Sequence, residues 1–271
     1  MSKCKITLFS NVGNSRENQE DNALLVGGRY LSSSEIAEIS FARKSFSYFC
    51  ECDQNEDFMA AVSDGMGGHA SGEIASGRTV KYLSENYRKI IDGAYLNEKF
   101  ISDEISRLNR DVVAFSKSNS GYRGMGATLC GVIRSKGAYY GFNVGDSRMY
   151  FYSNGVLEQL SEDHTEGQRL RKLNLLTEDE LKRFPRRKNL YKYVGVGGDL
   201  IPDVFTIDNC VPGSTLMICS DGVSDVINKN EIEEVLGRSD SSKEKGNLLV
   251  NEALKRNIGY GDNITLLLIE F

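Results

Sequence analysis

The sequence predicts an α+β fold in which antiparallel sheets pack face to face and helices cover the outside. Strand-like segments dominate both ends of the chain, and two amphipathic helical patterns lie between them. Each helical pattern has one apolar stripe, which needs a flat apolar surface to cover it. Strands followed by helices and then by strands do not suit the regular βαβ alternation of a doubly wound parallel sheet.

The N-terminal half supplies the first strands and both long helices. Residues 5–12 and 23–26 have the pattern of strands, and the apolar run at residues 58–63 (FMAAVS) has the length of a buried strand. Apolar residues then recur at helical spacing over residues 80–91 and 101–115. We therefore expect two amphipathic helices after these strands.

The C-terminal half supplies a meander and two further strands. The predicted strands of the meander are residues 127–133, 138–144, 149–152 and 156–160. Asn154 and Gly155 separate the last two, and this dipeptide favours a two-residue hairpin turn because both positions require a positive φ. Further strands are predicted at residues 215–220 and 264–271, and helices around residues 231–236 and 245–255.

Composition and charge are those of an ordinary globular protein. The chain has 271 residues, with 33 Lys and Arg against 38 Asp and Glu, which gives a net charge of −5. This balance argues against a duplex-DNA binder, and we expect no nucleic-acid partner. No internal repeat or low-complexity linker divides the chain, which favours a single domain over residues 1–271.

No segment has the pattern of an export signal or a membrane span. The longest apolar stretch, residues 266–269, is far shorter than the about 20 residues that a spanning helix needs. The six cysteines are expected to be reduced thiols, since the chain is long and no export signal is apparent. We therefore expect a soluble cytoplasmic protein with no membrane partner.

Several carboxylates follow apolar strands and lie beside glycine. They are Asp64, Asp146, Asp221 and Asp262, with Asp225 one helical turn after Asp221. A strand end projects a side chain from a rigid base, and an adjacent glycine allows backbone or ligand to approach closely. One Asp-Gly pair is usually only a turn, but the recurrence of this arrangement favours a shared site.

Such a carboxylate cluster needs a counter-charge. Two carboxylates about 4 Å apart repel by about 4 kcal/mol at an effective dielectric constant near 20. Divalent cations remove this cost, and ligation by oxygen alone selects hard ions such as Mg²⁺ or Mn²⁺. The chain has only two histidines, His69 and His164, which are too few for a histidine-rich zinc or iron site.

The same residues carry a resemblance to the metal-dependent Ser/Thr protein phosphatases of type 2C, particularly the compact bacterial members. The matching segments, in the order of the family, are residues 13–21 (GNSRENQED), 63–69 (SDGMGGH), 124–128 (GMGAT), 143–148 (NVGDSR), 161–165 (SEDHT), 220–225 (SDGVSD) and 261–265 (GDNIT). The resemblance implies a four-layer α-β-β-α sandwich with two central antiparallel sheets. It extends from Gly13 to the C-terminus.

The resemblance also implies a centre of two Mn²⁺ or Mg²⁺ ions. Asp64 would bridge the two ions, and the Gly65 carbonyl, Asp221 and Asp262 would complete the protein ligands. Glu20 and Asp21 would orient metal-bound waters from behind the ligands. Asp146, together with Asp221 and Asp225, matches a weaker third-metal position of bacterial relatives.

Two further residues match catalytic roles of the family. Arg16 matches the residue that grips the substrate phosphate, a role that suits a guanidinium because its fork meets two oxygens at once. The alternative for Arg16 is a solvated surface arginine. His69 is the candidate proton donor to the departing serine or threonine alkoxide, and its alternative is a turn or helix-cap residue. For His164, the simpler interpretation is that it braces a loop.

The resemblance implies hydrolysis of phosphoserine and phosphothreonine in proteins by a metal-activated water at this binuclear centre. Phosphorylated proteins would be the substrates, and a cognate Ser/Thr kinase would be a partner in signalling. Two rivals remain: a pseudophosphatase that keeps the fold as a binding module, and a phosphatase dedicated to one regulatory protein, such as an anti-sigma antagonist. The presence of every expected ligand carboxylate argues against the pseudophosphatase.

Two segments fall outside this common pattern. Residues 166–198 match the variable flap beside the active site, and Arg186 and Arg187 within it form either a docking lip for acidic phosphoprotein or a solvated face. Residues 28–57 are longer than is usual in compact bacterial relatives. This insertion contains a short helical pattern at residues 35–42 and is either an extended hairpin or a partner surface.

Overall fold

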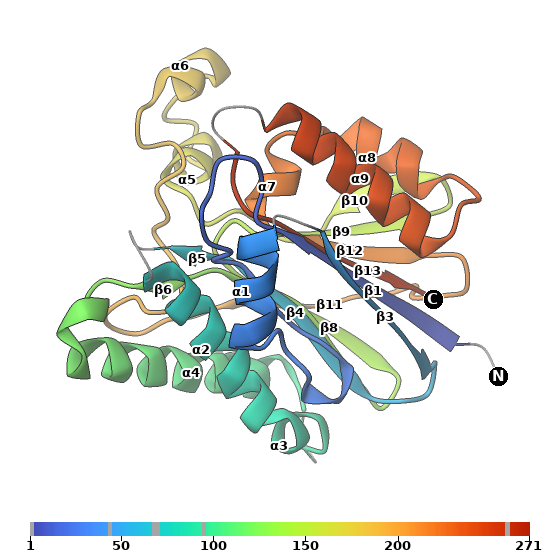
Figure 1. Ribbon diagram of the computed structural model, residues 1–271, viewed down its shortest axis with the longest axis horizontal. Coiled ribbons are helices and arrows are strands. Elements are labelled where there is room, and N and C mark those ends of the chain that lie inside the picture. The colour runs from blue at the N-terminus through green and yellow to red at the C-terminus, as the bar shows by residue number, and fades with distance from the viewer. Residues whose placement is uncertain (1–2, 43–44, 67–70, 94–95, 258–260) are drawn as a thin grey trace.

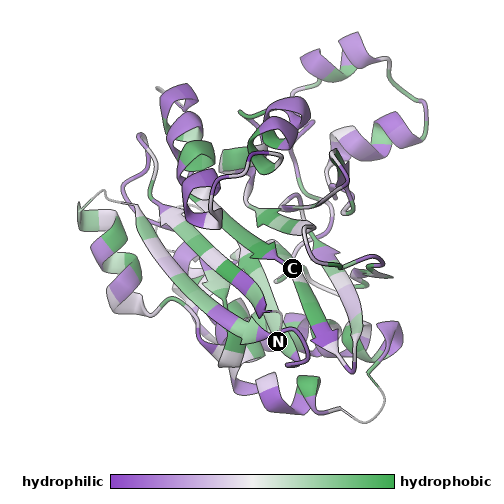
Figure 2. Cartoon of the chain, turned by 90° about the vertical axis from the view of Figure 1, so that its right-hand side faces the viewer, coloured by the Kyte–Doolittle hydropathy of each residue, from purple (hydrophilic) through white to green (hydrophobic). Residues whose placement is uncertain are grey.

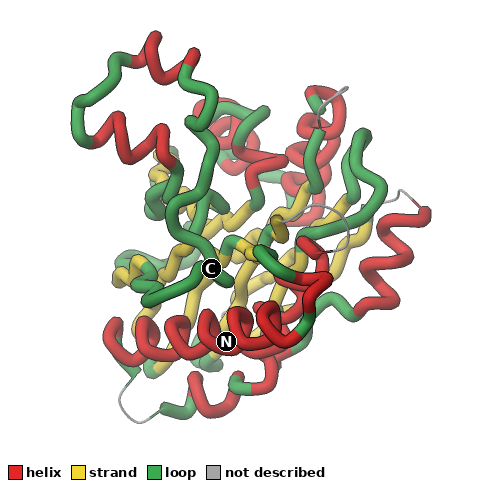
Figure 3. Tube along the Cα trace, turned by 90° about the vertical axis from the view of Figure 1, so that its left-hand side faces the viewer, coloured by secondary structure: helices red, strands yellow, loops and turns green. Residues whose placement is uncertain are grey.

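The computed structural model describes residues 3–42, 45–66, 71–93, 96–257 and 261–271. Over these ranges, two antiparallel sheets pack face to face in the centre and helices cover both outer faces (Figure 1). Figure 3 shows the same layers from another side, with strands lying between helices. The predicted four-layer α-β-β-α sandwich is confirmed.

The larger sheet is antiparallel and has the strand order β10-β9-β12-β13-β1-β3. Its strands are β1 (Lys3–Asn11), β3 (Phe46–Asp53), β9 (Arg148–Ser153), β10 (Val156–Gln159), β12 (Thr215–Cys219) and β13 (Ile264–Glu270). The first and last strands are neighbours, with Leu8 opposite Leu267. This pairing places the residues after β1 beside the residues before β13.

The smaller sheet has the order β11-β8-β7-β4-β2. Its strands are β2 (Asn22–Leu24), β4 (Phe58–Ser63), β7 (Leu129–Ser135), β8 (Ala138–Val144) and β11 (Asp203–Thr206). A short ribbon of β5 (Gly65–Met66) and β6 (Gly126–Ala127) continues β4 and precedes β7. The predicted strands 58–63 and 138–144 coincide with β4 and β8.

Each sheet has its own covering helices. On the smaller sheet these are α2 (Ser71–Glu85), α3 (Tyr87–Ile91) and α4 (Glu98–Ser118), and on the larger sheet α7 (Asp221–Ser224), α8 (Lys229–Leu236) and α9 (Ser242–Arg256). The starts of α8 and α9 are fixed by capping boxes, in which Asn228 pairs with Glu231 and Ser241 with Glu244.

The helical pattern over residues 80–91 is divided in the structure. Asn86 separates α2 from α3, and its side-chain amide donates a hydrogen bond to the Tyr82 carbonyl at 2.9 Å. A side chain that bonds a nearby carbonyl in this way competes with the helical backbone. The apolar spacing alone does not reveal this break, because the buried residues on both sides keep the same period.

Three apolar layers hold the sandwich together. The layer between the sheets includes Leu8, Phe58 and Leu267, all fully buried. The layer under α2 and α4 includes Met59 and Leu108, while a third layer lies beneath α8 and α9. Figure 2 shows hydrophobic residues concentrated on the strands and hydrophilic residues on the outer surfaces of the helices.

Within the described ranges, no helix has the length and apolar character that a membrane crossing requires.

The insertion at residues 28–57 forms a helix and an edge strand. Helix α1 (Ser33–Ala42) buries Ile36 and Ile39 against the core between the sheets and leaves Phe41 93% exposed. The strand β3 pairs with β1, whereas the following strand β4 belongs to the other sheet. The extended-hairpin interpretation is therefore wrong, since the two consecutive strands do not pair with each other.

Other short elements are also absent from the sequence-based expectations. They are the 3₁₀ turn η1 (Val26–Gly28), the edge strand β11, the ribbon β5–β6, and the helices α5 (Glu166–Lys172), α6 (Glu178–Arg183) and α7. The hairpin turn between β9 and β10 is as predicted, with φ of 52° at Asn154 and 80° at Gly155.

Gly246 provides a test of how closely α9 packs on the larger sheet. A Cβ atom at this position would overlap the ring of Phe9, which is fully buried on β1. We expect Gly246→Ala to lower the free energy of unfolding by about 1–3 kcal/mol, in spite of the higher helix propensity of alanine. Urea denaturation would measure this change. Asn247→Ala, on the exposed side of α9, is the control and should cause no loss; equal stability of the two variants would contradict the packing argument.

Candidate active site

A pocket of about 280 Å³ lies where β4, β8 and β12 end and β13 begins. Its lining residues are Arg16, Glu20, Asp64, Gly65, Met66, Thr128, Asp146, Lys188, Leu190, Asp221 and Asp262. These residues come from stretches far apart in the chain, and they include most of the residues predicted for the site. The gathering of carboxylates that the strand-end pattern predicts is therefore present in the fold.

Asp64 is positioned by backbone and hydroxyl contacts with Thr128. The Asp64 N–H donates to the Thr128 Oγ1 at 2.9 Å, and the Thr128 N–H donates to the Asp64 carbonyl at 2.8 Å. The Ser63 hydroxyl donates to the Thr128 carbonyl at 2.7 Å, and the Thr128 hydroxyl lies 2.6 Å from that of Ser147. These contacts hold the carboxylate at the end of β4 in one place.

The glycine after Asp64 allows a close approach of three backbone segments. A Cβ atom at Gly65 would overlap the Gly72 carbonyl and would lie 2.7 Å from the Glu20 carbonyl oxygen. The Gly65 N–H also donates to that Glu20 oxygen at 3.2 Å. Glycine is therefore required here by packing.

Asp221 and Asp262 are brought together by the close packing of α7 on the start of β13. A Cβ atom at Gly222 would overlap the Asn263 carbonyl oxygen. The Asn263 side chain donates to the carbonyls of Val12 and Asn18, and its oxygen accepts the Glu20 N–H at 2.8 Å. One amide side chain thus ties the loop after β1 to the segment that carries Asp262.

Burial and mutual repulsion raise the pKa values of the carboxylates in this region. Burial, and after it the charges of Asp21 and Asp221, raise the pKa of Asp64 well above its usual range. Burial followed by Asp146 does the same for Asp221. Burial also raises the pKa of Asp146 to about 7, with smaller contributions from other carboxylates. Such a cluster favours protons or cations at its centre.

Asp21 lies behind the pocket and not in its wall. Its side chain is nearly fully buried, and its Oδ2 accepts a hydrogen bond from the Ser220 hydroxyl at 2.7 Å. Burial raises its pKa to about 7. Among the described residues, neither Asp21 Oδ1 nor Asp221 Oδ1 has a hydrogen-bond partner, although both atoms are buried. A buried carboxylate oxygen without a partner can be satisfied by coordinating a hard cation or by accepting a hydrogen bond from a water bound to that cation.

The carboxylates do not form a preassembled cage. In the part of the chain that the structure describes, no group of three His, Cys, Asp or Glu side chains has the geometry to hold a metal ion. Asp262 has other partners, since its Oδ2 pairs with Arg16 Nη2 at 2.8 Å and its Oδ1 accepts the Asn263 N–H at 2.9 Å. The residues fit hard cations by their chemistry and by their orphaned oxygens.

Arg16 lies at the mouth of the pocket with its side chain 47% exposed. Burial opposes its charged form, but Asp262 and then Glu20 and Asp64 raise its pKa overall. Its guanidinium therefore remains a cation at the entrance. An oxyanion that reaches the pocket from solvent would meet this group beside the carboxylates.

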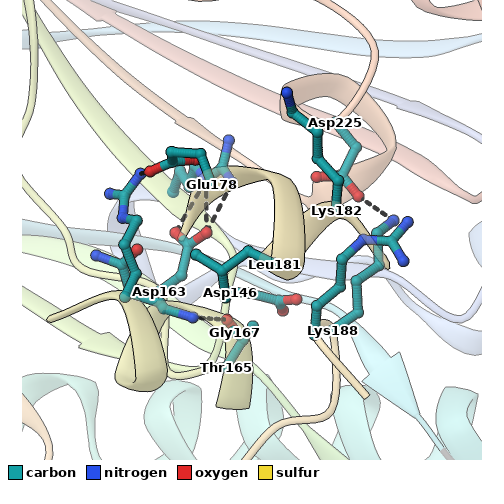
Figure 4. A pocket seen from close by; sticks show the side chains of 13 residues that line it. Asp146, Asp163, Thr165, Gly167, Glu178, Leu181, Lys182, Lys188 and Asp225 are labelled. Atoms are coloured by element: carbon teal, nitrogen blue, oxygen red, sulfur yellow. Dashed lines mark hydrogen bonds and ion pairs between the residues drawn. The ribbon is translucent and has the colours of Figure 1, made fainter. Parts of the chain in front are cut away.

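A second pocket of about 250 Å³ lies beside the first, beneath the flap helices α5 and α6 (Figure 4). Asp146 and Lys188 line both pockets, while Asp225 and Arg187 line this one. Figure 1 shows that α5 and α6 project from the body of the sandwich. Arg148 anchors the floor through a two-pronged contact with Asp163, at 2.9 and 2.7 Å.

The predicted substrate-contacting arginines are both exposed on the segment that returns from α6. The Arg186 guanidinium carbon is 5.8 Å from the centre of the Phe184 ring, and the Arg187 carbonyl accepts the Gly167 N–H at 3.0 Å. His69, the predicted proton donor, is one of residues 67–70 and lies outside the described residues.

His164 braces the loop that carries Asp146, in agreement with the simpler of its interpretations. The Gly145 N–H donates to His164 Nδ1 at 3.0 Å, so the ring proton is on Nε2, which lies 3.0 Å from Asp203 Oδ2. Asp203 also accepts from Lys192 at 2.7 Å. Burial works against ionisation of Asp203, but its contacts with His164 and Lys192 lower its pKa to about 2.

Several residues that build this site had no role assigned from the sequence. Thr128, Ser147, Ser220 and Asn263 belong to the quoted motif segments, yet only their tertiary partners reveal that they position carboxylates. Lys188 lies in a basic stretch where many residues are exposed, so the local sequence does not distinguish it from its neighbours.

Comparison with known proteins shows which family the chain resembles. A family model described as protein phosphatase 2C matches residues 46–257. The serine/threonine phosphatase stp of Listeria welshimeri is 34% identical over 211 residues, which cover 77% of this chain and 82% of that protein. Protein phosphatase PhpP of Streptococcus pneumoniae is 29% identical over 214 residues, which cover 78% of this chain and 85% of that protein.

Solved structures agree with the architecture. The serine/threonine phosphatase of S. agalactiae matches with a TM-score of 0.81 at 25% identity, over 98% of this chain and 99% of that chain. The Mycobacterium tuberculosis serine/threonine phosphatase PstP/Ppp matches with a TM-score of 0.77 at 24% identity, over 100% and 99% of the two chains. At 24% identity, the likeness to PstP/Ppp is evidence for the fold alone.

Thr128 allows a test of how the Asp64 backbone is held. Thr128→Val keeps the shape of the side chain but leaves the Asp64 N–H without its acceptor. We expect the free energy of unfolding to fall by about 1–3 kcal/mol in urea denaturation. Thr79→Val is the matched control, because Thr79 is equally buried but its hydroxyl donates only to the Ala75 carbonyl of its own helix. An equal loss in the two variants would show that the contact with Asp64 has no special weight.

Proposed function

Because this chain belongs to the protein phosphatase 2C family and is a protein serine/threonine phosphatase, we propose that it hydrolyses phosphoserine and phosphothreonine through a metal-activated water at a binuclear Mn²⁺ or Mg²⁺ centre. The observation that carries the proposal is the meeting of Asp64, Asp221 and Asp262 in one pocket with Arg16 at its mouth. These carboxylates come from the ends of separate elements, and they repel one another unless cations are present.

The proposed ligands are Asp64, the Gly65 carbonyl, Asp221 and Asp262. When bound, the two cations supply Lewis acidity, which lowers the pKa of a bound water and neutralises charge on the phosphate. Glu20 lines the pocket and Asp21 lies behind it, so both can accept hydrogen bonds from water at the centre. Asp146 and Asp225 are proposed for a weaker third position.

Arg16 and His69 have the proposed roles that need no metal. Arg16 binds two oxygens of the substrate phosphate and holds the phosphorus in line with the attacking water. In this role the guanidinium exchanges its contact with Asp262 for the phosphate. His69 donates a proton to the departing serine or threonine oxygen, a contribution of about 10²–10⁴ in rate.

The proposal extends to the setting of the enzyme. Phosphoproteins are the substrates, a Ser/Thr kinase supplies them, and the cytoplasm is the compartment. Arg186 and Arg187 contact acidic residues of the substrate around its phosphorylation site. Both side chains are exposed on the flap, which borders the second pocket. Residues 1–271 act together as one catalytic domain, with the flap and the insertion as its variable parts.

Replacement of one proposed ligand should abolish the reaction. Asp221→Asn keeps the size of the side chain but removes the charge that a hard cation requires. We expect Mn²⁺-dependent hydrolysis of a phosphothreonine peptide to fall by about 10³-fold or more, together with weaker Mn²⁺ binding in calorimetry. Asp199→Asn changes an exposed aspartate that does not line the pocket, and it should retain full activity. Normal turnover by Asp221→Asn would exclude the proposed centre.

The docking role of the flap arginines can be separated from catalysis. The double variant Arg186→Glu, Arg187→Glu should raise the KM for a phosphoprotein by about 3- to 10-fold, because two exposed charges are reversed. Hydrolysis of p-nitrophenyl phosphate should not change, since this substrate is too small to reach the flap. The double variant Lys243→Glu, Lys255→Glu on α9 has the same net charge and should leave both reactions unchanged. An unchanged KM in the flap variant would favour a solvated face.

A further inference from the structure

A lysine from the flap is paired with one of the carboxylates at the edge of the site. Lys188 Nζ forms an ion pair with Asp225 Oδ2, at the C-terminal end of α7. Figure 4 shows the two side chains facing each other from the flap and from α7. The contact joins residues 37 positions apart, so it depends on the tertiary fold.

The Lys188 side chain faces more than one carboxylate. It lines the first pocket together with Asp146 and Asp221, and the second pocket together with Asp146 and Asp225. Burial acts against its charge, but Asp225, then Asp221 and Asp146, raise its pKa. These are the three carboxylates that the family resemblance assigns to a weaker third cation.

We propose that the Lys188 ammonium is a built-in counter-ion for these carboxylates and that it competes with a third divalent cation for Asp225. The inference rests on the proposed function, since it concerns an ion additional to the binuclear centre. An ammonium and a divalent cation repel each other at contact distance, so binding of one to Asp225 weakens binding of the other. The chain therefore carries its own monovalent substitute for the third ion.

The position of Lys188 couples this exchange to the flap. The return segment, residues 184–192 after α6, is joined to the start of α5 on both sides of Lys188. The Gly167 N–H donates to the Arg187 carbonyl at 3.0 Å, and the Glu166 N–H donates to the Asn189 carbonyl at 2.8 Å. The ion pair with Asp225 thus ties α5 and the return segment to α7. A cation that takes Asp225 releases this tie, and the flap gains freedom.

Lys188→Met tests the competition because it removes the charge and keeps a long, flexible side chain. Lys182→Met is the matched control, since Lys182 also lies on the flap and lines the same second pocket but pairs with Asp179 in its own helix. Two measurements are made on the full chain: Mn²⁺ binding, followed by the electron paramagnetic resonance of free Mn²⁺, and hydrogen exchange of residues 166–192, followed by mass spectrometry.

We expect the wild-type protein to bind two Mn²⁺ ions tightly and a third weakly, with faster flap exchange only when the third ion binds. Lys188→Met should bind the third ion about tenfold more tightly, and its flap should exchange fast even before that ion is added. Lys182→Met should behave as the wild type in both measurements.

The outcomes separate this inference from the proposed function. The competition would be overturned if every protein bound two ions tightly and Lys188→Met bound the third ion with the same affinity as the wild type. The proposed binuclear centre would not be affected by that result. The same shift in Lys182→Met would also overturn it, since general charge loss would then be the cause. A wild-type protein that binds no Mn²⁺ would overturn the proposed function, and the inference with it.

Discussion

The burial of mutually repelling carboxylates at one end of the sandwich is the constraint on which the rest of the structure depends. Asp64 and Asp221 have pKa values raised well above the usual range, which means that the folded chain holds them where their charged forms are unfavourable. The unfolded chain has no such penalty, so the fold must compensate elsewhere. The three apolar layers between and outside the sheets supply that compensation, and they also fix the strand ends that carry the site.

The backbone segments that carry the carboxylates are held in place by close packing and by hydrogen bonds from buried side chains. Thr128 accepts a hydrogen bond from the Asp64 N–H and donates one to the Asp64 carbonyl. Asn263 joins the Asp262 segment to the loop after β1. At Gly65 and Gly222, the absence of a side chain allows backbone segments to touch. A site made in this way can resist electrostatic repulsion, because relaxation of one carboxylate would require a strand end to move.

The sequence predicts the parts of this structure whose signals are local. The apolar runs of β4 and β8 and the Asn154-Gly155 turn lie where the pattern places them, and the motif segments identify Asp64, Asp221 and Asp262 in advance. The pairing of β3 with β1 is not predictable in the same way, because the partner of an edge strand depends on the chain's path through η1 and α1. The contact between Lys188 and Asp225 is likewise set by how the flap folds back, and no spacing in the sequence encodes it.

Charge is distributed unevenly over the carboxylate cluster. Arg16 lies against Asp262 and Lys188 against Asp225, so side chains of the protein already compensate the outer carboxylates. Burial, and after it the charges of further carboxylates, destabilise the ionised forms of Asp64 and Asp221. A divalent cation that reaches Asp64 or Asp221 would relieve this cost directly, whereas one that binds Asp262 or Asp225 must first displace a cation that the chain itself provides.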